Sequence, residues 1–138
     1  MSIKNRNEIR EICIKVLYQV YILDKAKIAY NVNDLIKEQL EVENDFLNDL
    51  VNGVITNQEN ISSIANKYLK DWDIERLSKV DKAILSIAIY ELLYTETPPI
   101  VAINEALELS HKYSDESVTK MMNACLDKVY HEEVLHGE

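Results

Sequence analysis

The sequence predicts an all-α fold, a compact bundle of about seven helices, from three observations. Only two Gly and two Pro occur in 138 residues, which leaves little room for hairpins or Gly-rich loops. Hydrophobic residues make up 47% of the chain, enough to bury the core of one domain. Apolar residues recur at three- and four-residue steps from end to end, which is the period of helices. We therefore expect residues 1–138 to form a single domain.

The first half of the chain contains four predicted helices. The first has a continuous apolar stripe, made of Ile9, Ile12, Cys13, Val16, Leu17, Val20 and Tyr21. A short second helix follows Asn31 and ends near Leu40. A third spans 44–54, and a link at Thr56–Asn57 leads to a fourth with the inward positions Ile61, Ile64, Ala65, Tyr68 and Leu69. Gly53 lies on the polar side of the third helix, where it permits a close helix contact.

The second half begins with a strongly apolar helix at about residues 79–94. Ser78 lies three residues before Asp81, a capping arrangement that opens this helix. Apolar residues run almost all the way round it, so we expect it to be central to the domain. Pro98–Pro99 ends it, another helix follows, and Ser114–Asp115 caps the last one. The tail HEEVLHGE is predicted to be frayed.

The charge of the chain is unevenly distributed. The formal net charge of −9 argues against a nucleic-acid partner. Residues 1–30, however, contain six cationic and three acidic side chains, so the remainder is strongly acidic. From charge alone, two interpretations remain open: a basic end on an acidic body, or a solvated first helix. No signal pattern and no run of about eighteen apolar residues occurs, so we expect a cytoplasmic protein with no membrane partner.

The sequence has no recognisable catalytic or metal-binding pattern. His131 and His136 are five residues apart, about 140° round a helix, so they do not share the face that a zinc-binding helix requires. His111 is isolated, and Gly-rich phosphate loops and G-x-S-x-G are absent. Cys13 and Cys125 fall at apolar helical positions and are predicted to be buried free thiols. We therefore expect a protein that is not an enzyme and binds neither a metal nor a cofactor. Two classes of protein remain open: a nucleic-acid-binding adaptor or a purely protein-binding helical module.

One long stretch resembles a known family. Residues 71–114, DWDIERLSKVDKAILSIAIYELLYTETPPIVAINEALELSHKYS, resemble the signature of the NusB family of bacterial transcription antitermination factors. KMMNACLDK at 120–128 is similar to a second family motif, and REICIKVLYQV and FLNDLVNGV resemble the family's first and third helices. The resemblance covers nearly the whole chain. It implies an all-helical fold of two packed subdomains without catalytic activity.

The resemblance also implies partners. NusB proteins bind the boxA element of nascent RNA, chiefly ribosomal RNA leaders, together with the small-subunit ribosomal protein called NusE in this role. The pair joins RNA polymerase and other Nus factors in a complex that resists termination. A related domain is fused to RNA cytosine methyltransferases, but this chain ends before such a domain could fit, so we expect the stand-alone protein. The family includes monomers and dimers, which leaves a homodimer open.

Two residues are implied as contacts for NusE. Asp81 matches an acid on the family's NusE surface, and a carboxylate fixed on the first turn of a rigid helix suits a basic partner. The alternative for Asp81 is purely structural, since an acid at a helix N-terminus is favoured by the helix dipole by about 0.3–1 kcal/mol. Glu75, in the preceding turn, is the companion prediction.

A larger set is implied to bind RNA: Lys4, Arg6, Arg10, Tyr18, Tyr68, Lys120, Met121, Asn123 and Lys128. The cations neutralise phosphates, Tyr18 stacks on an unpaired base, and Asn123 reads a base edge or the backbone. Tyr68 either reaches RNA or packs in the core. The chain departs from the family where Glu8 dilutes its Arg cluster, Met121 replaces a Phe and Ala124 replaces a Gly. We therefore expect weaker RNA binding, or greater dependence on the protein partner.

Overall fold

The computed structural model describes residues 4–136 and contains six α-helices and no strand in that range. The elements are α1 (Arg6–Ala26), α2 (Val32–Gln39), α3 (Asp45–Tyr68), η1 (Ile74–Arg76), α4 (Lys79–Tyr94), α5 (Pro99–Tyr113), α6 (Glu116–Val129) and η2 (Tyr130–Leu135). The all-α prediction is confirmed. The expected count of about seven helices is slightly wrong.

The miscount arises in α3, which is one continuous helix where two were predicted. The link expected at Thr56–Asn57 does not form, because α3 continues through both residues. The side-chain amide of Asn57 donates to the Gly53 carbonyl one turn earlier, at 2.8 Å. Gln58, the residue after the expected link, has a polar side chain that is satisfied within the bundle, because it accepts from the Tyr21 hydroxyl at 2.7 Å and donates to Ser86 at 3.1 Å. The apolar stripe therefore continues past it.

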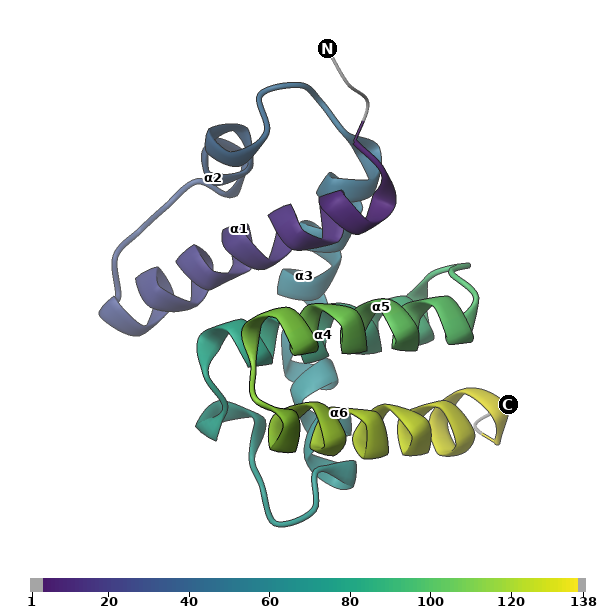
Figure 1. Cartoon of the computed structure of the whole chain (residues 1–138). Coiled ribbons are helices and arrows are strands. Elements are labelled where there is room, and N and C mark those ends of the chain that lie inside the picture. The colour runs from purple at the N-terminus through teal and green to yellow at the C-terminus, as the bar shows by residue number, and fades with distance from the viewer. Residues whose placement is uncertain (1–3, 137–138) are drawn as a thin grey trace.

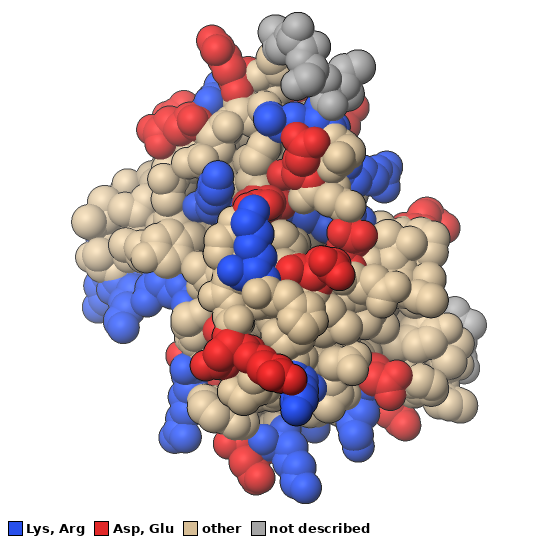
Figure 2. Space-filling view, in the orientation of Figure 1, with Lys and Arg blue, Asp and Glu red and all other residues tan. Residues whose placement is uncertain are grey.

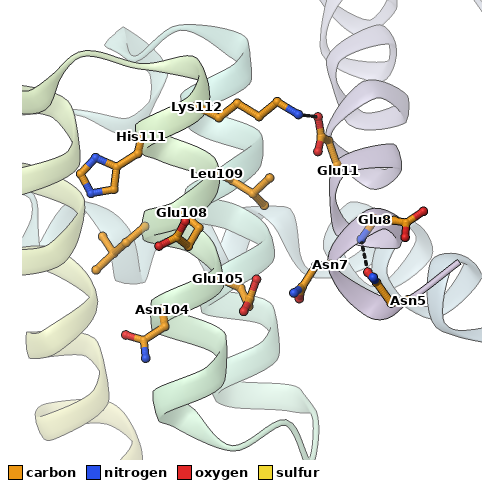
Figure 3. A pocket seen from close by; sticks show the side chains of 11 residues that line it. Asn5, Asn7, Glu8, Glu11, Asn104, Glu105, Glu108, Leu109, His111 and Lys112 are labelled. Carbon is orange, nitrogen blue, oxygen red and sulfur yellow. Dashed lines mark hydrogen bonds and ion pairs between the residues drawn. The ribbon is translucent and has the colours of Figure 1, made fainter.

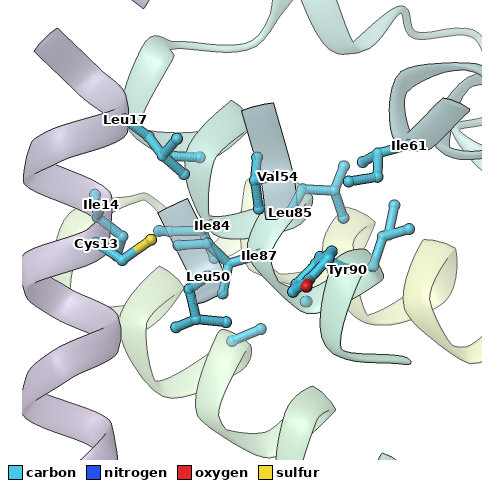
Figure 4. Packing of buried hydrophobic residues seen from close by; sticks show 14 of the residues in the cluster. Cys13, Ile14, Leu17, Leu50, Val54, Ile61, Ile84, Leu85, Ile87 and Tyr90 are labelled. Atoms are coloured by element: carbon cyan, nitrogen blue, oxygen red, sulfur yellow. The ribbon is translucent and has the colours of Figure 1, made fainter. Parts of the chain in front are cut away.

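The long α3 organises the bundle (Figure 1). Helix α1 packs against α3 and α2 packs against α1, while α5 and α6 lie towards the second half of α3. Helix α4 contacts α1, α3, α5 and α6, and eleven of its sixteen residues are buried. Side chains from α1, α3 and α4 interdigitate in the core, as Leu17, Val54 and Leu85 illustrate in Figure 4. The predicted central position of α4 is confirmed.

Gly53 allows α3 and α4 to approach closely, as predicted. Any Cβ at this position would collide with the ring and hydroxyl of Tyr90 in α4. The Tyr90 hydroxyl donates to Asp49 at 2.8 Å, so the ring is fixed from its far end as well. Glycine is required here by the close approach, since the backbone conformation of the helix makes no such demand.

The end of the chain is more ordered than predicted. Residues Tyr130–Leu135 of the tail form a π-helical turn, and Glu133 accepts from Tyr68 and from Lys67 at the end of α3. The prediction of fraying is therefore wrong for these residues, while the final two residues of the tail lie outside the described part of the chain. These two hydrogen bonds to the end of α3 hold the turn in place, and no local sequence pattern predicts them.

Both cysteines are buried free thiols, as predicted. Burial raises the pKa of Cys13 well above its ordinary value, and raises the pKa of Cys125 to about 12. Neither thiol is poised for redox or nucleophilic chemistry. None of the helices in residues 4–136 has the length and apolarity needed to cross a bilayer.

Candidate RNA and protein interface

The cationic start of α1 places two of the predicted RNA contacts on the surface. Lys4 and Arg6 are exposed. Lys4 lies 3.7 Å from Glu8, and the Arg6 guanidinium lies over the Phe46 ring, 4.3 Å from its centroid. Both interactions are solvent-exposed and weak, so both cations are accessible to a phosphate.

Arg10, the third cation predicted to contact RNA, differs from Lys4 and Arg6 in its surroundings. Its side chain is buried, with 2% of the residue exposed. Its guanidinium donates to both carboxylate oxygens of Glu91 in α4, at 2.8 and 2.7 Å, and to the Asn7 side chain at 2.9 Å. Glu91 is also buried and accepts from the Thr97 hydroxyl at 3.0 Å. Contact with a phosphate would require this ion pair to break inside the protein.

The outward face of α1 continues onto the end of α5. Tyr18 is 42% exposed on this face, in line with Lys15 and Glu11 one and two turns earlier. Glu11 accepts from Lys112 at 2.6 Å and from the Tyr113 hydroxyl. These two hydrogen bonds lower the pKa of Glu11. Tyr18 is thus available for stacking beside a junction between α1 and the end of α5.

Helix α6 presents a second group of predicted RNA contacts. Lys120, Asn123 and Lys128 are exposed, and Lys120 has only a loose pairing with Glu116 at 3.7 Å. Met121 is half-buried against the core. The chain therefore separates the predicted RNA residues into two groups, on α1 and on α6, with α5 between the two helices (Figure 1).

Tyr68 packs against the core and also keeps a partly exposed edge. It is half-buried at the end of α3, and its hydroxyl donates to Glu133 of η2 at 2.5 Å. The ring keeps a partly exposed edge beside Lys67, whose Nζ lies 5.5 Å from its centroid. RNA can reach the ring edge, but the hydroxyl already has a partner.

The two residues predicted to contact the protein partner differ sharply in exposure. Glu75 is exposed and pairs with Lys82 at 2.7 Å. Asp81 is only 8% exposed; its backbone N–H donates to Ser78 at 3.0 Å, and its carboxylate accepts from the Ser114 hydroxyl. The predicted cap is confirmed. The carboxylate links α4 to the α5–α6 connection, so the structural alternative accounts for most of its surroundings.

A groove of about 850 Å³ between α1 and α5 was not predicted from the sequence. Figure 3 shows Glu105 and Glu108 of α5 on one side and Asn7 and Glu11 of α1 on the other. Only the packing of α5 beside α1 brings these glutamates together, so no local sequence pattern indicates the groove. Figure 2 shows acidic and basic side chains interspersed over this face, without a continuous basic patch. The carboxylates make the groove an unfavourable place for a phosphate.

A smaller cavity of about 330 Å³ brings together residues from both predicted surfaces. Asp81 and Met121 line it, together with Trp72, Lys70 and Arg76 from the connection between α3 and α4. The sequence gave none of these last three a role. A lone tryptophan within the charged segment DWDIER was the available signal. The residues described here include no group of three or more His, Cys, Asp or Glu that could hold a metal ion.

Comparison with known proteins assigns the family. The NusB family model matches residues 7–131. The chain belongs to the NusB family. Transcription antitermination protein NusB of Pediococcus pentosaceus is 39% identical over 128 residues, which cover 91% of this chain and 96% of that relative. NusB of Acetivibrio thermocellus is 41% identical over 127 residues, covering 90% and 87%.

Solved structures agree with this assignment. T. maritima NusB has a TM-score of 0.81 to this chain at 28% identity, covering 95% of this chain and 94% of that one. A crystal structure of the antitermination factors NusB and NusE in complex with double-stranded RNA gives a TM-score of 0.78 at 26% identity, covering 92% and 96%. The NusB resemblance in the sequence is confirmed, and so is the helical architecture that it implied.

Proposed function

We propose that this chain is a transcription antitermination factor. It binds boxA RNA of nascent ribosomal transcripts together with NusE, and the pair helps to assemble an antitermination complex on RNA polymerase with other Nus factors. The observation that carries this proposal is the match over 92% of the chain to a NusB solved with NusE and RNA. The factor acts as a non-enzymatic adaptor without a cofactor, in the cytoplasm.

The arrangement of charge supports weak RNA binding by the isolated protein. Only Lys4 and Arg6 remain as accessible cations among the three expected at the N-terminus, because Arg10 is buried. An acidic groove lies beside them. A second macromolecule that contributes its own cations and binds the acidic body overcomes both disadvantages, which favours cooperative binding of RNA and protein.

The test is fluorescence anisotropy of labelled boxA RNA, with and without NusE, at several salt concentrations. We expect weak binding by the chain alone, tighter binding with NusE, and a slope of log K against log salt near −0.7 for each neutralised phosphate. A scrambled RNA is the control for sequence. Equal affinity with and without NusE contradicts the cooperative mechanism.

Variants of exposed residues locate the RNA surface. Lys4→Gln and Tyr18→Leu are expected to weaken binding, because both side chains are exposed on α1. Lys37→Gln is the matched control, since Lys37 is an exposed cation on α2, away from α5 and α6. An equal loss in Lys4→Gln and Lys37→Gln would show that net charge, and not this surface, determines affinity.

A helical protein-binding adaptor with no role in RNA binding is the second candidate. The buried Arg10 and the acidic groove favour it. It predicts that NusE or another basic protein binds, while no RNA produces a salt-sensitive change in anisotropy. The same titrations therefore separate the two functions.

A further inference from the structure

An exposed tryptophan stands at the junction of three segments. Trp72 is 50% exposed, and it is the only tryptophan in the chain. It follows α3 directly and lines the cavity of about 330 Å³ that also contacts the first turns of α4 and α6. In the described part of the chain, no aromatic ring stacks on the indole and no cation lies over it. A large apolar ring is thus left in water with a face unoccupied.

The backbone constrains the turn that carries the indole. Helix α3 ends at Tyr68, and Asp71 then adopts the left-handed conformation with φ of 63°, which is costly for a residue other than glycine. The backbone N–H of Trp72 donates to the Leu69 carbonyl at 3.4 Å, which closes the turn. The indole therefore projects from a turn whose backbone is constrained before any ligand arrives.

Charge differs between the two hollows that Trp72 lines. Lys70 and Arg76 line the cavity shared with Met121; both are exposed, and neither forms an ion pair with any residue from 4 to 136. The one carboxylate in that cavity, Asp81, is buried and accepts from Ser114. The second hollow has a volume of about 480 Å³. It is lined by Asp71, Asp73 and Glu75 as well as by Arg76.

We propose that this cavity is a base-stacking subsite for single-stranded RNA. One unpaired base stacks on the indole of Trp72, and the flanking phosphates lie against Lys70 and Arg76. Stacking on an aromatic ring beside unpaired cations is how proteins hold single strands. The acidic hollow excludes phosphates, so the strand lies towards Met121 and α6. The subsite rests on the proposed function, to which it adds three residues that connect the α6 group of RNA contacts to the α3–α4 connection.

A protein side chain is the competing occupant. A basic ribosomal protein is repelled by Lys70 and Arg76, whereas RNA is attracted by them. The cavity charge therefore favours RNA on the Lys70 side and leaves a basic partner the Glu75 side.

The intrinsic fluorescence of Trp72 reports directly on binding at this cavity, because the chain has no other tryptophan. We expect boxA RNA to quench the fluorescence of Trp72 in the full chain, with the same midpoint that anisotropy of labelled RNA gives. NusE added without RNA is the second titration, and RNA added to the preformed NusE complex is the third. Quenching by NusE alone, with none by RNA, overturns the subsite in favour of a protein contact.

Substitutions measure how much Trp72 and Lys70 contribute to RNA affinity. Trp72→Leu is expected to weaken RNA binding about five- to a hundredfold, while Trp72→Phe keeps most of the affinity. Lys70→Gln should reduce the salt slope by about 0.7, the value for one phosphate of a single strand. The matched control is Asp71→Asn, which alters the acidic hollow and keeps a residue type that tolerates the left-handed backbone. No loss of affinity is expected there.

The outcomes separate this proposal from the function on which it rests. If RNA binds but neither quenches Trp72 nor loses affinity in Trp72→Leu, the subsite is wrong and the antitermination function stands. If no RNA binds under any condition, with NusE present, both fail. Trp72 and Lys70 are exposed, so circular dichroism of the variants should match that of the unmodified chain, and a binding loss then reports the site itself.

Discussion

The buried ion pair between Arg10 and Glu91 makes the sharpest prediction. Substituting Arg10 by Met removes the guanidinium and leaves the Glu91 carboxylate, whose side chain is 1% exposed, with the Thr97 hydroxyl as its remaining partner. Removing one member of a buried pair costs about 3–5 kcal/mol, because the other charge stays desolvated. Domains of this size have a free energy of unfolding of about 5–15 kcal/mol, so the variant should be visibly destabilised.

The assay is urea denaturation followed by far-ultraviolet circular dichroism, with Arg10→Met, Glu91→Met and the double variant compared. We expect each single variant to lose several kcal/mol and the double variant to recover much of that loss, since two apolar side chains of similar volume can replace a buried pair. The two hydrogen bonds of 2.7 and 2.8 Å predict a large interaction energy between Arg10 and Glu91 in this double-mutant cycle.

RNA binding by the same variant decides between the two interpretations of Arg10. Suppose that the free energy of unfolding of Arg10→Met lies within about 1 kcal/mol of that of the unmodified chain, while its RNA affinity falls steeply. The guanidinium then contacts RNA, and the reasoning from burial is refuted. If the variant is destabilised, yet binds RNA normally under conditions where it is folded, Arg10 is structural. The Lys4→Gln variant provides the comparison, because Lys4 is exposed and its loss should affect RNA without affecting stability.

Three further predictions concern local contacts. Gly53→Ala should lower the midpoint of thermal unfolding. The collision with Tyr90 costs about 1–3 kcal/mol, which offsets or exceeds the roughly 1 kcal/mol by which Ala is favoured over Gly in a helix. A raised or unchanged midpoint contradicts the close contact. Asp81→Ala should cost about 1–3 kcal/mol, and Ser114→Ala should add little to it in a denaturation cycle, because both remove the same hydrogen bond. Glu11 has a pKa below its ordinary value of 4.5, so its ionised form stabilises the fold above that pH and the effect is lost as pH falls through the lowered pKa. The stability difference between the unmodified chain and Glu11→Gln should therefore shrink in acid, and a difference that grows contradicts the sign.

Features encoded within a few residues were predictable from the sequence. The Ser78 cap of α4, the apolar stripe of α1 and the central position of α4 all follow from spacing over one or two turns, and the structure confirms each. Capping and helical periodicity are local interactions, so a single sequence is sufficient to see them.

Features that join distant segments were not predictable in the same way. Arg10 and Glu91 are 81 residues apart, and the N-terminal position of Arg10 among other cations suggested RNA. The missed indication lay in the partner: Glu91 interrupts an otherwise apolar helix, and a charge at such a position requires a buried counter-ion. The continuity of α3 is similar, since Gln58, next to the link expected at Thr56–Asn57, is satisfied by Tyr21 and Ser86, which are 37 and 28 residues away in sequence.

The candidate surfaces adjoin one another, which affects how the function can be tested. Asp81 and Met121, predicted for different partners, line one cavity, so Asp81→Lys would place a cation in the proposed RNA subsite while it also removed the hydrogen bond to Ser114. A loss of NusE binding in that variant would have two causes. Glu75→Gln is the cleaner substitution, because Glu75 is exposed and its ion pair within residues 4–136 is with Lys82, whose Nζ also lies 4.3 Å from the centroid of the Tyr21 ring. If Glu75→Gln weakens NusE binding and leaves RNA quenching of Trp72 unchanged, the two partners use different residues of the α3–α4 connection, and their cooperativity requires no shared contact residue.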